Sequence, residues 1–115
     1  MTKVLLVEDE LDLLALVSEA LTHLGLAVTE ADSGLKALQR LRDGAPFDVL
    51  VSDIAMPGNL SGIDVAHEVL SAYPGMRVIL TSGHPLSNFP PLPKNVRFLP
   101  KPYRLKQLVE LLEGS

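Results

Sequence analysis

Five polar residues in four separate stretches of the chain could act together at one site. They are Glu8, Asp9, Asp53, Ser82 and Lys101, and each follows or closes a short apolar run. Three carboxylates that meet in one crevice repel one another, so either some stay protonated or a cation neutralises them. Mg²⁺ prefers oxygen ligands and typically combines one or two carboxylates with a phosphate oxygen. The set therefore indicates phosphoryl chemistry around Mg²⁺.

Ser82 and Lys101 complement the acids. A hydroxyl can donate a hydrogen bond to one phosphoryl oxygen, and an ammonium can pair with another. The sequence has no nucleotide-binding glycine loop, so the simplest chemistry makes Asp53 the nucleophile, which becomes an aspartyl-phosphate. Each residue also has an ordinary interpretation: Asp53 as a loop aspartate that turns the chain, Ser82 as a strand-end serine and Lys101 as a solvated lysine.

Short apolar runs precede or include these residues and predict strands buried on both faces of a parallel sheet. The predicted strands are 4–7, 26–31, 49–52, 77–82 and 96–99, and the more polar 26–31 is expected at a sheet edge. Helical segments separate them, which predicts an α/β, flavodoxin-like, doubly wound five-stranded parallel sheet of order 2-1-3-4-5. In such sheets ligands bind at the carboxyl ends of the strands, where the candidate residues stand.

Apolar spacing predicts helices between the strands, except where prolines interrupt it. In the first, Leu13, Leu16 and Val17 widen the apolar stripe, so we expect a helix covered on much of its surface. In the second, we expect Leu35 to face inward with the leucines that follow it. Prolines crowd residues 84–95, so the helix expected between the fourth and fifth strands should be short, irregular or missing.

Composition bounds the class of protein. The 115 residues fit a single domain spanning 1–115, and 47% hydrophobic residues indicate a globular chain. A formal charge of −4 argues against nucleic acid as a partner, and the absence of cysteine excludes a thiol nucleophile. The start of the chain is neither a signal peptide nor a membrane span. We therefore expect a cytoplasmic protein without a membrane partner.

Four motifs resemble those of the response-regulator receiver domains of two-component signalling. They are Val-Glu-Asp-Glu, Ser-Asp-Ile-Ala-Met-Pro, Leu-Thr-Ser-Gly-His and Leu-Pro-Lys-Pro-Tyr, in the family's order. The resemblance covers essentially the whole chain. It implies that Asp53 accepts a phosphoryl group from a histidine kinase or histidine phosphotransfer protein, and that any catalysis is limited to the chain's own phosphorylation and dephosphorylation.

The resemblance also implies roles for the residues around Asp53. Asp9, Asp53 and the backbone carbonyl of Ala55 would bind Mg²⁺, with Glu8 acting mainly through water. Ser82 would be the switch hydroxyl, Lys101 would pair with the phosphoryl group, and the Lys101–Pro102 bond is expected to be cis. An unknown downstream protein would receive the signal.

The chain departs from the family's commonest pattern at several positions. The family often has aspartate where this chain has Glu8, and the loop after Pro57 is one residue longer before Gly62, as in stand-alone or hybrid-kinase receivers. The switch aromatic is Phe98, which cannot hydrogen-bond through a hydroxyl. Two positions that influence phosphoryl lifetime in the family are Ala55 and His84, and His84 can also be interpreted as a solvated loop histidine.

Three functions compete on the sequence. The first is a phosphoacceptor switch in a phosphorelay, with Mg²⁺ as cofactor. The second is a protein-interaction module that keeps the receiver fold but works independently of phosphorylation. The third is a flavin-binding protein, which would need a phosphate-binding loop after the first strand, where Glu8, Asp9 and Glu10 would instead repel the flavin phosphate.

Overall fold

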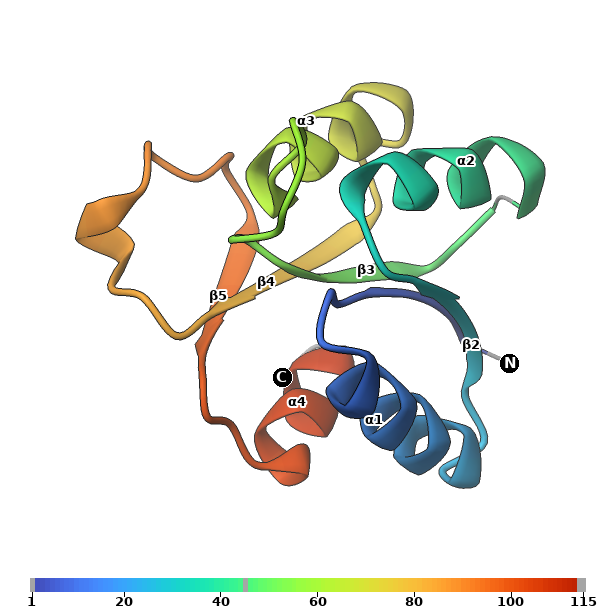
Figure 1. The fold of residues 1–115 in the computed structure, drawn as a ribbon. Helices are drawn as coiled ribbons and strands as arrows, with labels where there is room; N and C mark the ends of the chain where they lie inside the picture. Colours follow the sequence, from blue (N-terminus) through green and yellow to red (C-terminus); the bar gives the residue numbers. More distant parts are fainter. Residues whose placement is uncertain (1, 45, 114–115) are drawn as a thin grey trace.

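A computed structural model of the protein describes residues 2–44 and 46–113. Strands and helices alternate along the chain (Figure 1). In order they are β1 (Lys3–Val7), α1 (Leu11–His23), β2 (Ala27–Ala31), α2 (Gly34–Gly44), β3 (Val49–Asp53), α3 (Gly62–Ala72), β4 (Arg77–Ser82), a 3₁₀ turn (Leu86–Asn88), β5 (Val96–Pro100) and α4 (Leu105–Leu112).

The five strands form one parallel sheet in the order β2-β1-β3-β4-β5. This confirms the predicted fold class and topology, including the edge position of β2. Helices α1 and α4 cover one face of the sheet, and α2 and α3 cover the other (Figure 1). Because the strands are parallel, their carboxyl ends meet at one edge. β1 and β3, which carry the acids, are adjacent there.

Alternation along the strands divides the core into two layers. On β4, Val78 and Leu80 point toward α2 and α3, while Ile79 points toward α1 and α4. All five residues of β3 are buried, which is why the run has no polar alternation until its last residue, Asp53. The central strand therefore anchors the candidate nucleophile from both sides.

Two helix predictions were wrong in detail. Leu16 is 66% exposed on α1 and Leu35 is 58% exposed on α2. The buried residues of α2 include Ala37 and Leu41, four residues apart on one face, and Leu35 lies about 200° round the axis from Ala37. Burial follows the face that the sheet covers, and these two leucines lie outside it.

The segment between β4 and β5 confirms the proline-based prediction. Within residues 83–95 the only helical structure is the three-residue 3₁₀ turn. Phe89 and Leu92 from this segment pack against the apolar cluster beneath α3 and are half-buried. A pair of side chains thus takes the place of a covering helix. Within the described residues, every helix is too short or too polar to cross a membrane.

Candidate functional site

The carboxyl ends of β1, β3 and β5 bring four of the predicted residues together. One carboxylate oxygen from each of Glu8, Asp9 and Asp53 lies within 4.8 Å of the others. Lys101 Nζ is 2.6 Å from Glu8 Oε1 and 3.3 Å from Asp53 Oδ2. Residues 93 positions apart in sequence are therefore joined by an ion pair. The cluster lies where the strand order predicts it.

The backbone around Asp53 is held closely in place. The N–H of Ile54 donates to the carbonyl of Thr81 at 2.9 Å, and the N–H of Gly62 donates to the carbonyl of Ile54 at 2.9 Å. A Cβ at Gly62 would overlap the backbone carbonyl of Asp53. Glycine thus lets the start of α3 pack directly on the end of β3.

Burial dominates the electrostatics of Asp53. Its side chain and backbone together are 7% exposed. Burial raises the pKa of the Asp53 carboxyl to about 6, and Glu8 and Asp9 add to the rise while Lys101 opposes it. In the metal-free protein the Asp53 anion is therefore destabilised by its surroundings, and a cation bound at the cluster would relieve this.

Lys101 is held as a cation. Burial on its own would lower the pKa of the ammonium, but the hydrogen bond to Glu8 and the charge of Asp53 outweigh it, so the pKa is raised. Glu8 also accepts a hydrogen bond from the N–H of Glu10 through Oε2 at 3.1 Å. Both Glu8 oxygens are thus engaged, which holds Lys101 beside Asp53.

Ser82 ends β4 beside this cluster but its hydroxyl is turned to its own loop. The side chain is 1% exposed, and its oxygen accepts a hydrogen bond from the N–H of His84 at 2.9 Å. The Lys101 N–H donates to the Ser82 carbonyl at 2.8 Å, which ties the ends of β4 and β5 together. The Ser82 proton stays free to be donated elsewhere.

His84, Ala55 and Phe98 lie around the cluster rather than in it. His84 is exposed, and its ring stands edge-on to Phe89 with the centroids 6.3 Å apart. Ala55 is exposed two residues after Asp53. Phe98 is half-buried against the apolar layer under α2 and α3, in register with Leu80. The Lys101–Pro102 peptide bond is cis, as predicted.

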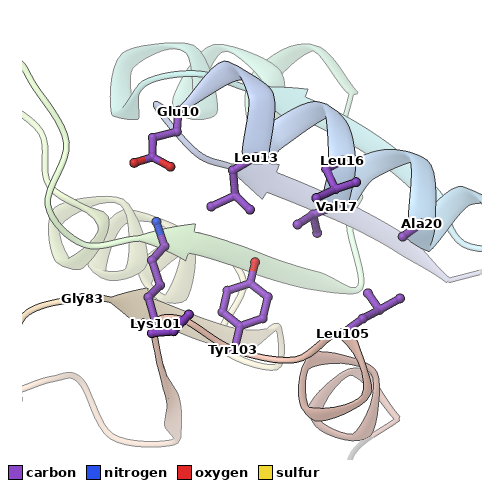
Figure 2. Close-up of a pocket in the computed structure, with 10 residues that line it drawn as sticks. Glu10, Leu13, Leu16, Val17, Ala20, Gly83, Lys101, Tyr103 and Leu105 are labelled. Atoms are coloured by element: carbon purple, nitrogen blue, oxygen red, sulfur yellow. The ribbon is translucent and has the colours of Figure 1, made fainter.

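A groove of about 720 Å³ runs from the cluster between α1 and the loop that enters α4. Figure 2 shows leucines of α1 on one side of the groove. On the other side, the side chains of Lys101 and Tyr103 point toward α1. Burial raises the pKa of the Tyr103 hydroxyl. Sequence reasoning gave Tyr103 no role, although it directly follows the Lys-Pro pair that the motif contains.

The three carboxylates of Glu8, Asp9 and Asp53, which we call the acidic cluster, suit Mg²⁺. They offer three carboxylate oxygens within reach of one ion, and hard oxygen ligands are those that Mg²⁺ takes. When all three acids are ionised, the ammonium of Lys101 faces three carboxylates and cannot neutralise them alone. The donor set and the charge both fit a divalent cation.

Comparisons with known proteins agree with this arrangement. The model of the response regulator receiver domain matches residues 4–113. The chain is 32% identical to the response regulator receiver protein CpdR of Brucella abortus, covering 98% of this chain and 95% of that protein. It is 37% identical to part of the sensor kinase CckA of the same organism, covering 96% of this chain and 12% of the kinase.

Solved structures share the fold at lower identity, and TrrA is an example. The response regulator protein TrrA of Thermotoga maritima, solved in complex with Mg²⁺-BeF, superposes with a TM-score of 0.83 at 27% identity. The match covers 99% of this chain and 98% of TrrA.

Proposed function

The chain belongs to the response-regulator receiver family, and from this premise we propose that it is a phosphoacceptor switch in a two-component phosphorelay. Asp53 receives the phosphoryl group with Mg²⁺ as cofactor, in the cytoplasm. The observation that carries the proposal is the buried Asp53 carboxylate, which lies 3.3 Å from Lys101 and beside two further acids. One buried carboxylate, one ammonium and two further carboxylates thus lie together at the carboxyl edge of the sheet, which supports these roles.

In the proposed reaction an Asp53 oxygen forms a bond to phosphorus while the bond from phosphorus to the donor histidine nitrogen breaks. Lys101 stays within reach to pair with a phosphoryl oxygen, and Ser82 can donate its free proton to another. Glu8, Asp9, Asp53 and the Ala55 carbonyl would hold Mg²⁺, which supplies positive charge against the acids and the phosphoryl group. The chain catalyses only its own phosphorylation and dephosphorylation.

Phosphorylation is proposed to shift a pre-existing equilibrium. Ser82 would turn from the His84 N–H toward the new phosphoryl oxygens, and Phe98 would repack. A tenfold population change needs about 1.4 kcal/mol, within reach of one or two charge-assisted hydrogen bonds. Ala55 has no group to orient an attacking water, so His84 is the side chain proposed to affect phosphoryl lifetime.

A histidine kinase or histidine phosphotransfer protein is the proposed phosphodonor. The relative that is a sensor kinase contains a stretch similar to this chain, which supports a partner of that class. A protein donor must cover the surface around Asp53, and the apolar groove that ends at Lys101 is one surface that such a donor could contact. The downstream protein that reads the phosphorylated state is unknown.

Incubation with acetyl phosphate and Mg²⁺ tests the proposal. Intact mass should increase by one phosphoryl group, and the adduct should be alkali-labile and absent in Asp53→Ala. The matched control is Asp43→Ala, an exposed acid on α2, which should be modified like the wild type. An unmodified wild-type protein would overturn the proposal and leave the interaction module, which predicts equal partner binding by wild type and Asp53→Asn.

A further inference from the structure

The loop that follows Asp53, residues 54–61, touches α2 at one very close contact. A Cβ built on Gly34, the first residue of α2, would lie 2.6 Å from Leu60 Cβ and 2.8 Å from the Leu60 carbonyl oxygen. Neither atom is the end of a flexible side chain. Any residue larger than glycine at position 34 must therefore displace the backbone of the loop or the start of the helix.

The start of α2 is fixed on its own side. Ser33 Oγ accepts a hydrogen bond from the N–H of Lys36 at 3.2 Å, and Arg40 Nε donates to the Glu30 carbonyl at 3.1 Å. Gly34 is itself buried. Ala37 and Leu41 of α2 are buried in the core as well, so a movement of the helix away from Leu60 would expose apolar surface.

The far end of the loop is fixed as well. Ser61 caps α3 through reciprocal hydrogen bonds with Asp64 at 2.9 and 3.2 Å. Between the two ends, Pro57, Gly58 and Asn59 are exposed, so the middle of the loop gains little from packing. The end of the loop is joined to its beginning, because the N–H of Gly62 donates to the carbonyl of Ile54 at 2.9 Å. A displacement of Leu60 would therefore be passed on to Ile54 and Ala55.

We propose that Gly34 is a positioning residue for Mg²⁺ binding: its close approach to Leu60 sets the position of the loop, and with it the position of the Ala55 carbonyl relative to the acidic cluster. The proposal rests on the proposed function, because it assumes that Ala55 is a metal ligand. Groups that position a metal ligand contribute to metal binding, and loss of such a group typically lowers the affinity for the metal about 10–100-fold. Helix α2 would then help to position a site to which it contributes no functional group.

Gly34→Ala tests this directly. Mg²⁺ is titrated into metal-free protein while the backbone amide signals of Ile54 and Ala55 are followed by NMR. We expect the dissociation constant to rise about tenfold and these signals to be displaced before Mg²⁺ is added. Phosphorylation by acetyl phosphate should recover at saturating Mg²⁺, because the variant changes the affinity for the ion rather than the nucleophile.

Gly44→Ala is the matched control on the same helix. A Cβ there would meet the Phe47 ring at 3.7 Å, an ordinary contact, so Mg²⁺ affinity should match the wild type. Equal dissociation constants for Gly34→Ala, Gly44→Ala and the wild type would overturn the inference.

A second pair keeps the inference testable if Gly34→Ala does not fold. Leu60→Gly removes the atom that would lie nearest to a Cβ at position 34, while Asn59→Gly adds the same backbone freedom at an exposed neighbour. Leu60→Gly should weaken Mg²⁺ binding more than Asn59→Gly does, and equal effects would count against the contact. If the wild type itself bound no Mg²⁺, the proposed function would fail instead, so the two failures are distinguishable.

Discussion

Two regions at the carboxyl edge of the sheet are built in opposite ways. At the ends of β1, β3 and β5, Glu8 and Asp53 are buried, and Lys101 is ion-paired to both of them. After β4, residues 83–95 run largely exposed through four prolines and a single 3₁₀ turn. The first region contains the acidic cluster, and we call the second the proline-rich segment.

The difference suggests a division of tasks. The acidic cluster has its charges fixed before any reaction, which suits chemistry that depends on preorganised groups. The proline-rich segment has few backbone hydrogen bonds and little buried area, the properties of regions that open at low free-energy cost. The N–H of His84 donates a hydrogen bond to Ser82 Oγ, beside the cluster, so a rotation of the Ser82 side chain would break a contact of the segment.

Lys101→Met should have the largest effect, because it removes the cation that faces both Glu8 and Asp53. Loss of one preorganised charge partner typically costs about 10²–10³-fold in rate. We expect a fall of this size in the rate of phosphorylation by acetyl phosphate, measured by intact mass. Lys94→Met, in the exposed proline-rich segment, is the control and should react at the wild-type rate; equal rates for both variants would remove the contrast between the regions.

Gly62→Ala should come next, since the added methyl would overlap the Asp53 carbonyl. The backbone must shift to accept it, and we expect a loss of about 3 kcal/mol in the free energy of unfolding, measured by urea denaturation. Gly75→Ala has nothing within 4 Å of its new atom and should change stability little. A Gly62→Ala variant as stable as Gly75→Ala would mean that the end of β3 is less rigid than the contact implies.

Asp53→Asn should stabilise the metal-free protein at neutral pH. Because the folded pKa of Asp53 is about 6, above its usual 3.8, the folded state binds more protons between these values, and stability falls as the pH rises through them. Asparagine avoids this cost, so at pH 7.5 with a chelator we expect a gain of about 2–3 kcal/mol in the free energy of unfolding, shrinking toward zero near pH 4. A gain that does not depend on pH would argue against a buried Asp53 anion.

The fold could be predicted from the sequence because its three central strands, β1, β3 and β4, are buried on both faces. Runs such as 49–52 and 77–82 have no polar alternation, and chains with that pattern between helices have few alternative topologies. The exposure of Leu16 and Leu35 could not be read in the same way. Apolar spacing shows which residues could face a core, whereas the width of the covered face depends on which helices pack beside it.

The positions of the site residues followed from strand order, but their partners did not. Once Glu8, Asp53 and Lys101 are assigned to strand ends, a parallel sheet brings them to one edge. That Lys101 bonds to Glu8 more closely than to Asp53 depends on side-chain reach and loop geometry. The contact of Gly34 with Leu60 is set by the packing of a helix on a loop, for which a single sequence carries no periodic signal.

The smallest effect is expected in the proline-rich segment, from Phe89→Ala. Phe89 is half-buried against the core and stands edge-on to His84, so its loss should cost about 1 kcal/mol in the free energy of unfolding. Leu86 is 45% exposed, so Leu86→Ala should lower the free energy of unfolding by less. Phosphorylation rates should stay within about twofold of wild type in both, since neither side chain reaches the reacting atoms.

Hydrogen exchange is where Phe89→Ala should differ from its control. Amides of residues 84–95 should exchange faster in Phe89→Ala than in Leu86→Ala, while the amides of β3 keep their protection, because only the segment loses an anchor. Faster exchange in β3 as well would show that the segment and the acidic cluster open as one unit. In that case phosphorylation could not move the segment independently, and Phe98 together with β5 would have to carry the signal instead.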